Sequence, residues 1–461
     1  MLHRLYGSIH PHDRKAATRG MEVTALDRAP THVVLPMIMH VGDPCNPIVA
    51  VGDHVLLGQK IAEPNGPGSP IHASVSGTVV AVEPRPHPNG NCVTAVVIEN
   101  DYQDTPALAL ERKADPENLT CWEVADLITK AGIVGLGGTG YPTGAKLKDA
   151  IGNVDTLIIN GTECEPYVTA DHRLILEDGE RILGGTEILM RTLGLKTARI
   201  GIQANKMNGI RNLRSLLPED SGIRIMALKT RYPQGAETQL IRTLTGRRVP
   251  PGKLPVDVNC VVFNIATVAA IYDAVVHGIP LTHRIITVSG GAVNEPRNLL
   301  VPVGTPLEHL LEECGGLHKQ PDRVLLGGPM TGIAQHSLDA SILKSTRALL
   351  FLTAKECSSV PAKSSPCIRC GRCIKACPMN LTPLYFGLYA QSGRFRELEK
   401  FHITDCMECG CCAYVCPSHI DLVQSIRTAK QEICRQDPAQ DKCRATPEEI
   451  CVPQAGKEDT P

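Results

Sequence analysis

Several features are scarce in this 461-residue sequence, and each scarcity excludes a class of function. Aromatic residues make up only 3 % of the chain and the formal net charge is −1, so the sequence lacks both the stacking surfaces and the positive field that nucleic-acid binding requires. The most apolar stretch, residues 260–281, contains Asn264, Asp273 and His277, which are unfavourable in a bilayer. We therefore expect a buried helix there and a soluble protein. The first residues lack the apolar core of a signal peptide, which favours a reducing cytoplasm.

Cysteine, in contrast, is abundant, with nineteen residues. In a secreted protein these would form disulfides, whereas cysteines crowded at short spacing in a reducing compartment usually hold metal. Eight of them form two copies of the pattern C-x2-C-x2-C-x3-C-P, which begin 39 positions apart. The first copy is Cys367, Cys370, Cys373 and Cys377, and the second is Cys406, Cys409, Cys412 and Cys416.

This spacing is the one that bacterial ferredoxins use, and there the fourth cysteine of each run binds the other cluster. We therefore predict two [4Fe–4S] clusters, one held by Cys367, Cys370, Cys373 and Cys416 and the other by Cys406, Cys409, Cys412 and Cys377. A pair of zinc sites is the alternative, but zinc usually takes its ligands as two separated pairs. Cys411 is off register and receives no ligand role. A metal or redox role is left open for Cys434, Cys443 and Cys451.

The chain divides by pattern into five regions. Residues 1–117 contain short Val/Ile runs separated by Gly-Asp and Pro-Asn-Gly turns, which predicts β structure. Residues 118–282 alternate predicted helices (122–131 and 174–193) with continuous apolar runs (155–160 and 198–203), which is typical of a parallel sheet buried on both faces. In residues 283–353, β-rich segments surround one predicted helix at 306–314, which indicates a small α+β unit. Residues 354–433 hold the cysteine motifs between short helices, and residues 434–461 predict a flexible tail.

Within the first region, residues 51–62 and 73–80 resemble the two half-motifs of biotinyl/lipoyl-type barrel-sandwich domains. Those domains carry a modifiable lysine at a hairpin tip. Pro64, Asn65 and Gly66 occupy that place here, so we expect a structural or docking module without a lysine arm.

A glycine-rich segment between two predicted helices is a candidate phosphate site. Gly135, Gly137, Gly138 and Gly140 lie close together and Lys146 follows. Glycine lets the backbone approach a phosphate closely, and the next helix offers N–H donors. The segment lacks the G-x-G-x-x-G spacing, directly after a strand, of dinucleotide-binding folds. An ordinary turn therefore stays open as the alternative.

Polar residues also interrupt apolar surroundings in three further segments. The first follows the predicted strand at 155–160, at the end of the strand where α/β proteins place ligands. The polar residues of the three segments are Asn160, Glu163, Glu165, Glu237, Thr238, Asn264 and Thr267. Any single carboxylate of this set could instead be an ordinary residue at a helix start or on the surface.

Together these segments resemble the NADH-oxidising, FMN-bearing subunit of respiratory complex I. Residues 135–146 are similar to its flavin loop G-R-G-G-A-G-F-P-T-G-x-K, and residues 160–166 to its N-A-D-E-S-E-P. Residues 235–238 and 264–267 are similar to its G-E-E-T and N-N-V-E-T. The sequence departs from these patterns at Leu136, Tyr141, Thr162 and Cys164, where the family has Arg, Phe, Asp and Ser.

The order of regions resembles that of the RnfC proteins, which are subunits of the Rnf ion-translocating complexes. Residues 288–293 and 326–330 are similar to the soluble ligand-binding β-grasp (SLBB) unit, and residues 10–15 and 40–44 to the N-terminal barrel. The resemblance implies a multi-domain α/β and α+β protein: a barrel-sandwich domain (1–117), a Rossmann-like FMN/NADH domain (118–282), an SLBB β-grasp module (283–353) and a helical ferredoxin-like domain with two [4Fe–4S] clusters (354–433).

The same resemblance implies the function. The chain would be a peripheral subunit on the cytoplasmic face of the cell membrane, in a complex that couples ferredoxin–NAD electron transfer to Na⁺ or H⁺ translocation. NAD(H), FMN and the clusters would exchange electrons in turn. The expected partners are integral-membrane and ferredoxin-type subunits and NAD(H), with no nucleic acid. The glycines at 135, 137, 138 and 140 would bind the cofactors together with Lys146, Asn160, Thr238, Asn264 and Thr267, and Glu163, Glu165 and Glu237 would act in the dinucleotide pocket.

Two other functions remain open at this point. The first is a soluble flavin/iron–sulfur reductase that serves a cobalamin enzyme or another small-molecule reductase. The N-terminal barrel and neighbouring genes for membrane subunits would argue against it. The second is a flavin-free electron-wiring module, which reconstitution with iron, sulfide and FMN would test.

Overall fold

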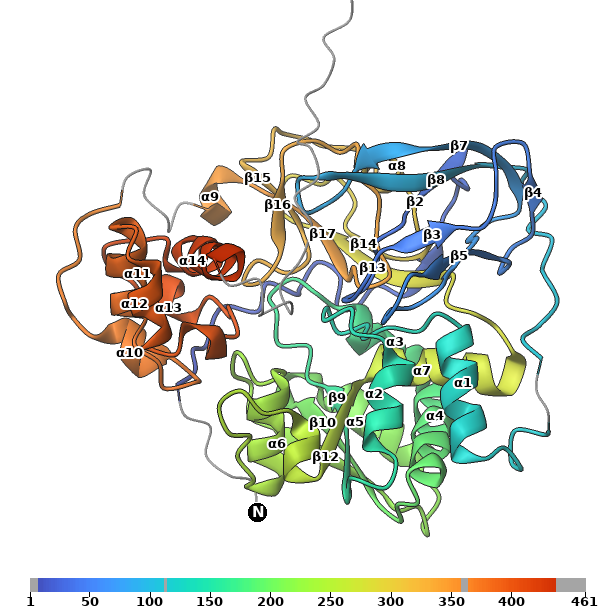
Figure 1. The fold of residues 1–461 in the computed structure, drawn as a ribbon, viewed down its shortest axis with the longest axis horizontal. Coiled ribbons are helices and arrows are strands. Elements are labelled where there is room, and N and C mark those ends of the chain that lie inside the picture. The colour runs from blue at the N-terminus through green and yellow to red at the C-terminus, as the bar shows by residue number, and fades with distance from the viewer. Residues whose placement is uncertain (1–6, 112–113, 358–363, 437–461) are drawn as a thin grey trace, which may run out of the picture.

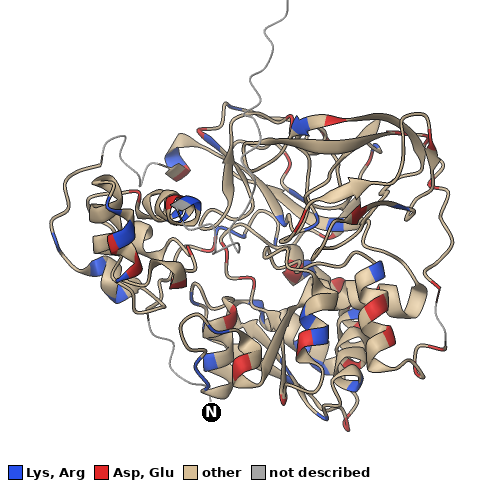
Figure 2. Cartoon of the chain, viewed as in Figure 1, with Lys and Arg blue, Asp and Glu red and all other residues tan. Residues whose placement is uncertain are grey.

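The computed structural model describes residues 7–111, 114–357 and 364–436. Figure 1 shows a β region and a β-grasp region side by side above an α/β region, with the cysteine motifs in a helical lobe at one end. Lys/Arg and Asp/Glu side chains are interspersed over these regions (Figure 2). The predicted tail lies outside the described residues from position 437 onward, and so do Cys443 and Cys451.

Two small antiparallel sheets form the N-terminal β region, in the strand orders β2-β8-β7-β4 and β3-β5-β6. Their inward side chains, including Val33, Leu35, Ile61 and Ile98, are fully buried in one core. At one end of this region, the Val41 N–H donates to the Gly140 carbonyl at 2.9 Å, so the β region contacts the glycine-rich segment. The strands are β2 (His32–Pro36), β3 (Cys45–Pro47), β4 (His54–Val55), β5 (Lys60–Pro64), β6 (Ile71–His72), β7 (Gly77–Pro86) and β8 (Cys92–Asn100).

The α/β region is built on a four-stranded parallel sheet in the order β11-β10-β9-β12. Strands β9 and β12 are mostly apolar and buried because helices cover both faces of the sheet. The strands are β9 (Thr156–Gly161), β10 (Ala198–Gln203), β11 (Ile223–Leu228) and β12 (Cys260–Asn264). The helices are α1 (Cys121–Lys130), α2 (Thr143–Ala150), α3 (Ala170–Glu177), α4 (Gly179–Thr192), α5 (Met207–Leu216), α6 (Glu237–Thr245) and α7 (Ile265–Tyr272). Short turns lie at η1 (Ala204–Lys206), η2 (Pro255–Val258) and η3 (Asp273–His277).

One helix prediction in this region was wrong. The segment 174–193 is not a single helix, because α3 ends and α4 begins at Asp178. Asp178 has non-helical dihedrals (φ −127°, ψ 39°), and its carboxylate accepts from the Arg181 guanidinium at 2.8 Å. Side chains of α5 pack against Gly179, where any larger residue would collide with Leu216 and Leu213. The break lets α3 and α4 follow different directions around the sheet.

The β-grasp region has a mixed six-stranded sheet in the order β1-β14-β13-β17-β15-β16. Strand β1 (Val23–Ala25) comes from the N-terminal part of the chain and pairs in parallel with β14. Helix α8 (Leu307–Glu313) packs on the sheet through Leu307 and Leu310, both fully buried. The other elements are β13 (His283–Ser289), β14 (Arg297–Pro302), β15 (Arg323–Leu326), β16 (Ile333–Gln335), β17 (Ala348–Leu352) and α9 (Ala354–Cys357).

Residues 7–25, here named the strap, connect the helical lobe, the α/β region and the β-grasp sheet. Ile9 pairs with Tyr232 through two backbone hydrogen bonds of 2.9 and 3.0 Å. Further along, Lys15 is buried against Glu163, and the strap ends in β1. The strap therefore holds three regions together before the chain enters the β region.

A buried lysine marks a second junction. Lys344 donates to the Pro70 carbonyl at 2.5 Å and to the Gly132 carbonyl at 2.8 Å, so one side chain joins the β, α/β and β-grasp regions. Burial lowers the pKa of Lys344 to about 7.

The helical lobe packs around Phe386, Leu398 and Ile426, which are fully buried. Its elements are α10 (Arg372–Ala376), α11 (Pro383–Gln391), α12 (Phe395–Glu399), η4 (Ile403–Asp405), α13 (Cys411–Tyr414) and α14 (Leu422–Gln436). None of the helices in the described ranges is both long enough and apolar enough to cross a membrane.

Candidate functional site

A cavity of about 350 Å³ lies at the carboxyl ends of β9 and β12, under the glycine-rich segment. This is the edge at which parallel sheets place ligands. Of the predicted residues, Gly135, Gly137, Gly138, Lys146, Asn160, Glu163, Glu165, Glu237, Asn264 and Thr267 line it. Gly140 lies instead against the β region, and the Thr238 hydroxyl points to Met379 in the helical lobe, 3.9 Å from its sulfur.

The glycine-rich segment is fixed to the sheet from below. The Leu136 N–H donates to the Thr267 hydroxyl at 2.9 Å, and the Leu136 side chain is buried. Gly138 has φ +105°, a conformation that side chains rarely adopt, and the Arg347 guanidinium lies beside it. The glycines of the segment therefore present their backbone to the cavity, and Thr139 lines it beside them.

Polar side chains of the cavity wall hold one another in place through an ion pair and hydrogen bonds. Lys146 pairs with Glu237, which is the first residue of α6. The Asn160 amide donates to the Gly235 carbonyl at 2.8 Å, and the Thr162 hydroxyl donates to Asn160 Oδ1 at 2.7 Å. A side chain at position 235 would collide with Thr162, which explains the glycine there.

Asn264 connects the end of β12 to α3. Its Oδ1 accepts from the Ala266 N–H at 2.9 Å and so caps α7. Its Nδ2 donates to Asp171 Oδ2 at 2.8 Å. Asp171 is buried, has no ion pair among the described residues, and its pKa is raised, first by burial and then by the nearby Glu163 carboxylate.

Glu163 is surrounded by donors from the protein itself. Its carboxylate accepts from the Asp171 N–H at 2.7 Å and from Lys15 Nζ at 3.1 Å. Its carbonyl oxygen accepts from Lys15 at 2.8 Å and from Lys206 at 3.3 Å. Burial lowers the pKa of Lys206 to about 7. Although Glu163 lines the cavity, its carboxylate is engaged by the start of α3 and by the strap.

Glu165 joins the α/β region to the β-grasp region. Its carboxylate accepts from the Thr331 hydroxyl at 2.6 Å and from the Met330 N–H at 3.1 Å. Burial raises its pKa. A side chain at Gly328 would collide with Glu165, so this glycine makes room for the carboxylate.

The cysteines of the two predicted sets lie in two separate hollows. Cys377, Cys406, Cys409 and Cys412 line one, together with Cys411. Cys367, Cys370, Cys373 and Cys416 line the other. The fourth cysteine of each run thus lies with the first three of the other run, as the ferredoxin pattern requires. Among the described residues, no three His, Cys, Asp or Glu side chains converge as they would around a single metal ion.

One of these sets also reaches the cavity. Met407 and Cys409 form part of the cavity wall opposite the glycine-rich segment. The buried Tyr232 fixes this contact, because its hydroxyl donates to the Cys409 carbonyl at 2.8 Å while its backbone pairs with the strap. We name Cys377, Cys406, Cys409 and Cys412 the inner set and the other four cysteines the outer set.

Comparison with known families gives four matches in chain order. Residues 3–103 match the RnfC barrel sandwich hybrid domain, and residues 128–273 match the Nuo51 FMN-binding domain. Residues 285–334 match the SLBB domain, and residues 366–420 match a 4Fe-4S dicluster domain. The multi-domain fold predicted from the sequence is confirmed by these matches.

Curated relatives match over nearly the whole chain. The chain is 42 % identical to the C subunit of the Na⁺-translocating ferredoxin:NAD⁺ oxidoreductase complex of Acetobacterium woodii, over 93 % of this chain and 97 % of that one. It belongs to the C-subunit family of ion-translocating oxidoreductase complexes. The C subunit of the proton-translocating complex of Clostridium ljungdahlii is 42 % identical, over 94 % of both chains. The corresponding protein of Rhodobacter capsulatus is 41 % identical, over 93 % of this chain and 82 % of that one.

The predicted membership of the C-subunit family is thereby confirmed. Several other residues that line the cavity of this family member received no role from the sequence, among them Asp171, Tyr232, Thr331 and Arg347. Tyr232 begins the polar segment 232–238, which was singled out in the sequence, but no function was assigned to its side chain. Arg347 comes from the β-grasp region, and nothing local in the sequence relates it to the glycine-rich segment.

Proposed function

We propose that this chain passes electrons between NAD(H), FMN and two [4Fe–4S] clusters as a peripheral subunit of a membrane complex. In that complex, ferredoxin–NAD electron transfer is coupled to Na⁺ or H⁺ translocation, and the chain lies on the cytoplasmic face. Its relatives are subunits of such complexes, which supports the integral-membrane and ferredoxin-type subunits as partners. The electron-transfer role makes the chain an NADH-linked oxidoreductase and translocase subunit.

One observation carries the proposal: Cys409 of the inner set lines the same cavity as the glycine-rich segment. A nucleotide held by that segment would lie directly beside a cluster held by the inner set. Neither a zinc protein nor a disulfide-stabilised domain requires this arrangement.

The residues of the cavity fit FMN. Its volume of about 350 Å³ lies within the range of small-molecule sites. Gly137 and Gly138 bring their backbone to the cavity without side chains, and Lys146 and Arg347 are the cationic side chains in the wall. When bound, FMN exchanges two electrons with a nicotinamide as a hydride and single electrons with iron–sulfur clusters.

The charges of the wall single out Arg347 as a phosphate ligand. Glu237 neutralises Lys146, and Lys15 neutralises Glu163. Arg347 has no ion pair within 4.0 Å among the described residues and lies beside Gly138. A guanidinium in this position suits the dianionic phosphate of FMN.

Arg347→Gln is expected to weaken FMN binding about tenfold, the effect of losing one charge-assisted hydrogen bond. Riboflavin, which lacks the phosphate, should bind the variant as it binds the unaltered protein. Flavin fluorescence quenching during titration of the reconstituted apoprotein measures both affinities. The matched control is Arg323→Gln, which removes an exposed arginine on β15 of the same region.

Equal weakening of FMN and riboflavin would contradict a phosphate contact and would assign Arg347 a structural role. A raised KM for NADH with unchanged FMN affinity would place the contact on the dinucleotide and would contradict the FMN assignment.

The positions of the two cysteine sets suit two clusters that pass electrons one after the other. Thiolate is the ligand that [4Fe–4S] clusters require, and each set supplies four. The inner set is mostly buried and one of its cysteines, Cys409, lines the cavity, whereas Cys370 of the outer set is exposed. We infer that electrons pass from the cavity to the inner set, then to the outer set, and then to the partner, or in the reverse direction.

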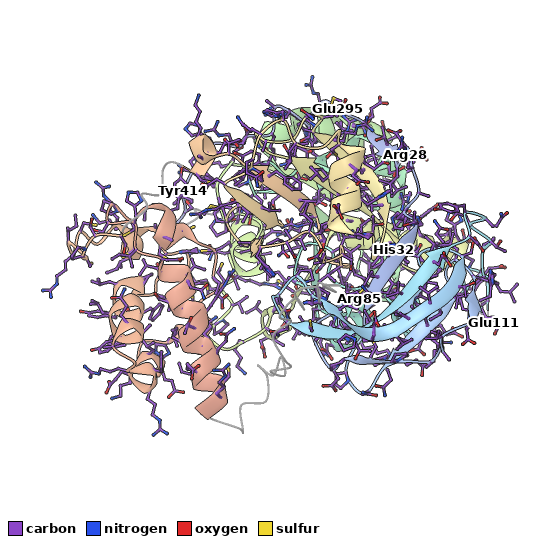
Figure 3. The ribbon with its side chains drawn as sticks, turned by 90° about the horizontal axis from the view of Figure 1, so that it is seen from above. Arg28, His32, Arg85, Glu111, Glu295 and Tyr414 are labelled. Carbon is purple, nitrogen blue, oxygen red and sulfur yellow. The ribbon has the colours of Figure 1, made fainter. Side chains whose placement is uncertain are left out.

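The surface around the outer set suits an acidic partner. Arg369, Arg372 and Lys375 are exposed on the first motif, and Ile368 and Ile374 are exposed beside them. Residues 364–396 contain no Asp or Glu. Figure 3 shows the helical lobe, on which Tyr414 is labelled, at one end of the molecule.

Replacing both Arg369 and Arg372 with glutamate is expected to slow electron exchange with the ferredoxin-type partner about tenfold at low salt, because steering is lost. The difference should shrink at high salt. Reduction of ferricyanide by NADH serves as the internal control and should be unchanged. Partner exchange at the normal rate would place the docking surface elsewhere.

The two alternatives are tested by reconstitution. The chain is loaded with iron, sulfide and FMN under anaerobic conditions and NADH is added. Bleaching of the flavin absorbance supports the proposal, whereas flavin that washes out would support the flavin-free wiring module. A soluble reductase is disfavoured by the family, whose members are subunits of ion-translocating complexes.

A further inference from the structure

A second cavity of about 450 Å³ lies between the α/β and β-grasp regions. Its wall contains the end of α3, the residues after α7, and β13 with β14. Glu177 and Ile279 at its rim are exposed, so it communicates with solvent. The proposed FMN and NAD(H) sites do not use this cavity.

Asp171 is the single acidic residue that lines both cavities within the described part of the chain. It occupies the first turn of α3, which separates the two spaces, and its side chain is almost fully buried. On one side it accepts from Asn264, which lines the nucleotide cavity. On the other side lie three carboxylates of the second cavity, from Glu177, Asp178 and Asp273.

The proposed reaction needs a proton path at this place. Oxidation of NADH follows NADH → NAD⁺ + H⁺ + 2 e⁻, and the reverse reaction consumes the proton. Electrons can leave the cavity through the inner cysteine set, but a proton moves only along groups that can bind it. A nucleotide in the first cavity would exclude solvent from its mouth.

We propose that Asp171 relays protons between the nucleotide cavity and the solvent-connected second cavity. The inference rests on the proposed function. NADH would give up its hydrogen as a hydride, together with both electrons, to a bound flavin. Once those electrons passed on to the clusters, the hydrogen would remain as a proton, which would bind the Asp171 carboxylate and leave into the second cavity. The same path would operate in reverse during reduction of NAD⁺.

The surroundings of Asp171 suit a relay. Burial raises its pKa, the Glu163 carboxylate raises it further, and Arg347, the Asn264 hydrogen bond and Arg284 act in the opposite direction. A proton-transfer group works best with a pKa near the working pH. On the second-cavity side, Arg181 is already paired with Asp273 and Asp178, and the pKa of His283 is lowered by burial.

Arg284 provides a reason for water in the second cavity. It is buried, it lines this cavity, and its Nε has no hydrogen-bond partner among the described residues. Its Nη2 donates to the Leu136 and Thr346 carbonyls at 3.2 and 3.3 Å. A buried donor of this kind is normally satisfied by ordered water, and such water would carry protons towards Asp171.

The test uses Asp171→Asn, whose amide oxygen can still accept from Asn264. Infrared difference spectra of the flavin-free protein, recorded over a pH titration, should show a protonated-carboxyl band that persists to higher pH than that of an ordinary aspartate, shifts in D₂O and disappears in the variant. Glu313→Gln is the matched control, because Glu313 is also buried but lines neither cavity and accepts from the Asp27 and Arg28 N–H groups.

In the FMN-loaded protein, single-turnover bleaching of the flavin by NADH measures the hydride step separately, so the rate of proton release in Asp171→Asn is expressed relative to the bleaching rate of the same variant. Proton release during turnover with ferricyanide, followed with a pH-indicator dye, should slow about 100-fold and show a larger solvent isotope effect. Asp171→Glu should recover part of the rate.

A variant that releases protons at the unaltered rate, or an infrared spectrum without the Asp171 band, would overturn the relay. If the unaltered protein fails to bind FMN, the proposed function fails instead, and the infrared result still reports on Asp171 separately.

Discussion

Replacing Cys409 with alanine is expected to remove about four of the roughly eight irons of the reconstituted protein. It should also abolish the reduction of the remaining cluster by NADH. Cys409 belongs to the inner set and lines the nucleotide cavity, so its loss would interrupt the path at its first step. Iron analysis together with EPR after addition of NADH measures both effects.

Two matched variants make this prediction specific. Cys411→Ala changes the buried neighbour of Cys412, which is off register in the motif, and should retain all of the iron. Cys370→Ala should lose the outer cluster but keep NADH-driven reduction of the inner one. Equal iron loss from Cys409→Ala and Cys411→Ala, or from both clusters in Cys370→Ala, would contradict the assignment of the two sets.

Glu163→Gln is expected to destabilise the protein strongly. The change leaves the buried Lys15 ammonium without its counter-charge, and removing one partner of a buried ion pair costs about 3–5 kcal/mol. Lys206, which donates to the Thr162 and Glu163 carbonyls, loses the same nearby negative charge. The strap should therefore open more readily where it contacts the α/β region.

Native-state hydrogen exchange measures this opening. The Tyr167 N–H, which donates to the Asp13 carbonyl of the strap at 2.8 Å, is a suitable probe. The control is Asp126→Asn, which breaks the exposed Lys148–Asp126 pair and should change stability by about 1 kcal/mol or less. Unchanged protection of Tyr167 in Glu163→Gln would show that the ion pair does not hold the strap.

The sequence was sufficient to predict those features that depend on residues close together in the chain. The apolar run at 198–203 is β10 with the same limits, and the cysteine spacing grouped the eight sulfurs as the two hollows do. Both depend on neighbours in sequence, namely burial of a strand on both faces and thiolates around one loop. The break at Asp178 was missed although a local signal is present, because residues 177–181 contain no apolar residue and include an Asp-Gly dipeptide, which is typical of a turn.

What could not be predicted depends on contacts between distant parts of the chain. Lys15 and Glu163 are 148 positions apart, and no pattern near either residue indicates the pair. Glu165 was proposed for the dinucleotide pocket, but it also binds Thr331, 166 positions away, which only the docking of two regions determines. Arg347 entered the site for the same reason, through the packing of the β-grasp sheet on the α/β region, whereas Asp171 comes from α3 of the α/β region itself and accepts from Asn264.

The adjacency of a nucleotide cavity and the inner cysteine set is tested most directly by one anaerobic measurement. The chain is reconstituted with iron, sulfide and FMN, treated with NADH and frozen for EPR. The account predicts a reduced [4Fe–4S] signal that depends on both FMN and NADH and is lost in Cys409→Ala. A colourless protein that contains zinc, or a cluster that NADH leaves oxidised while the flavin bleaches, would contradict it.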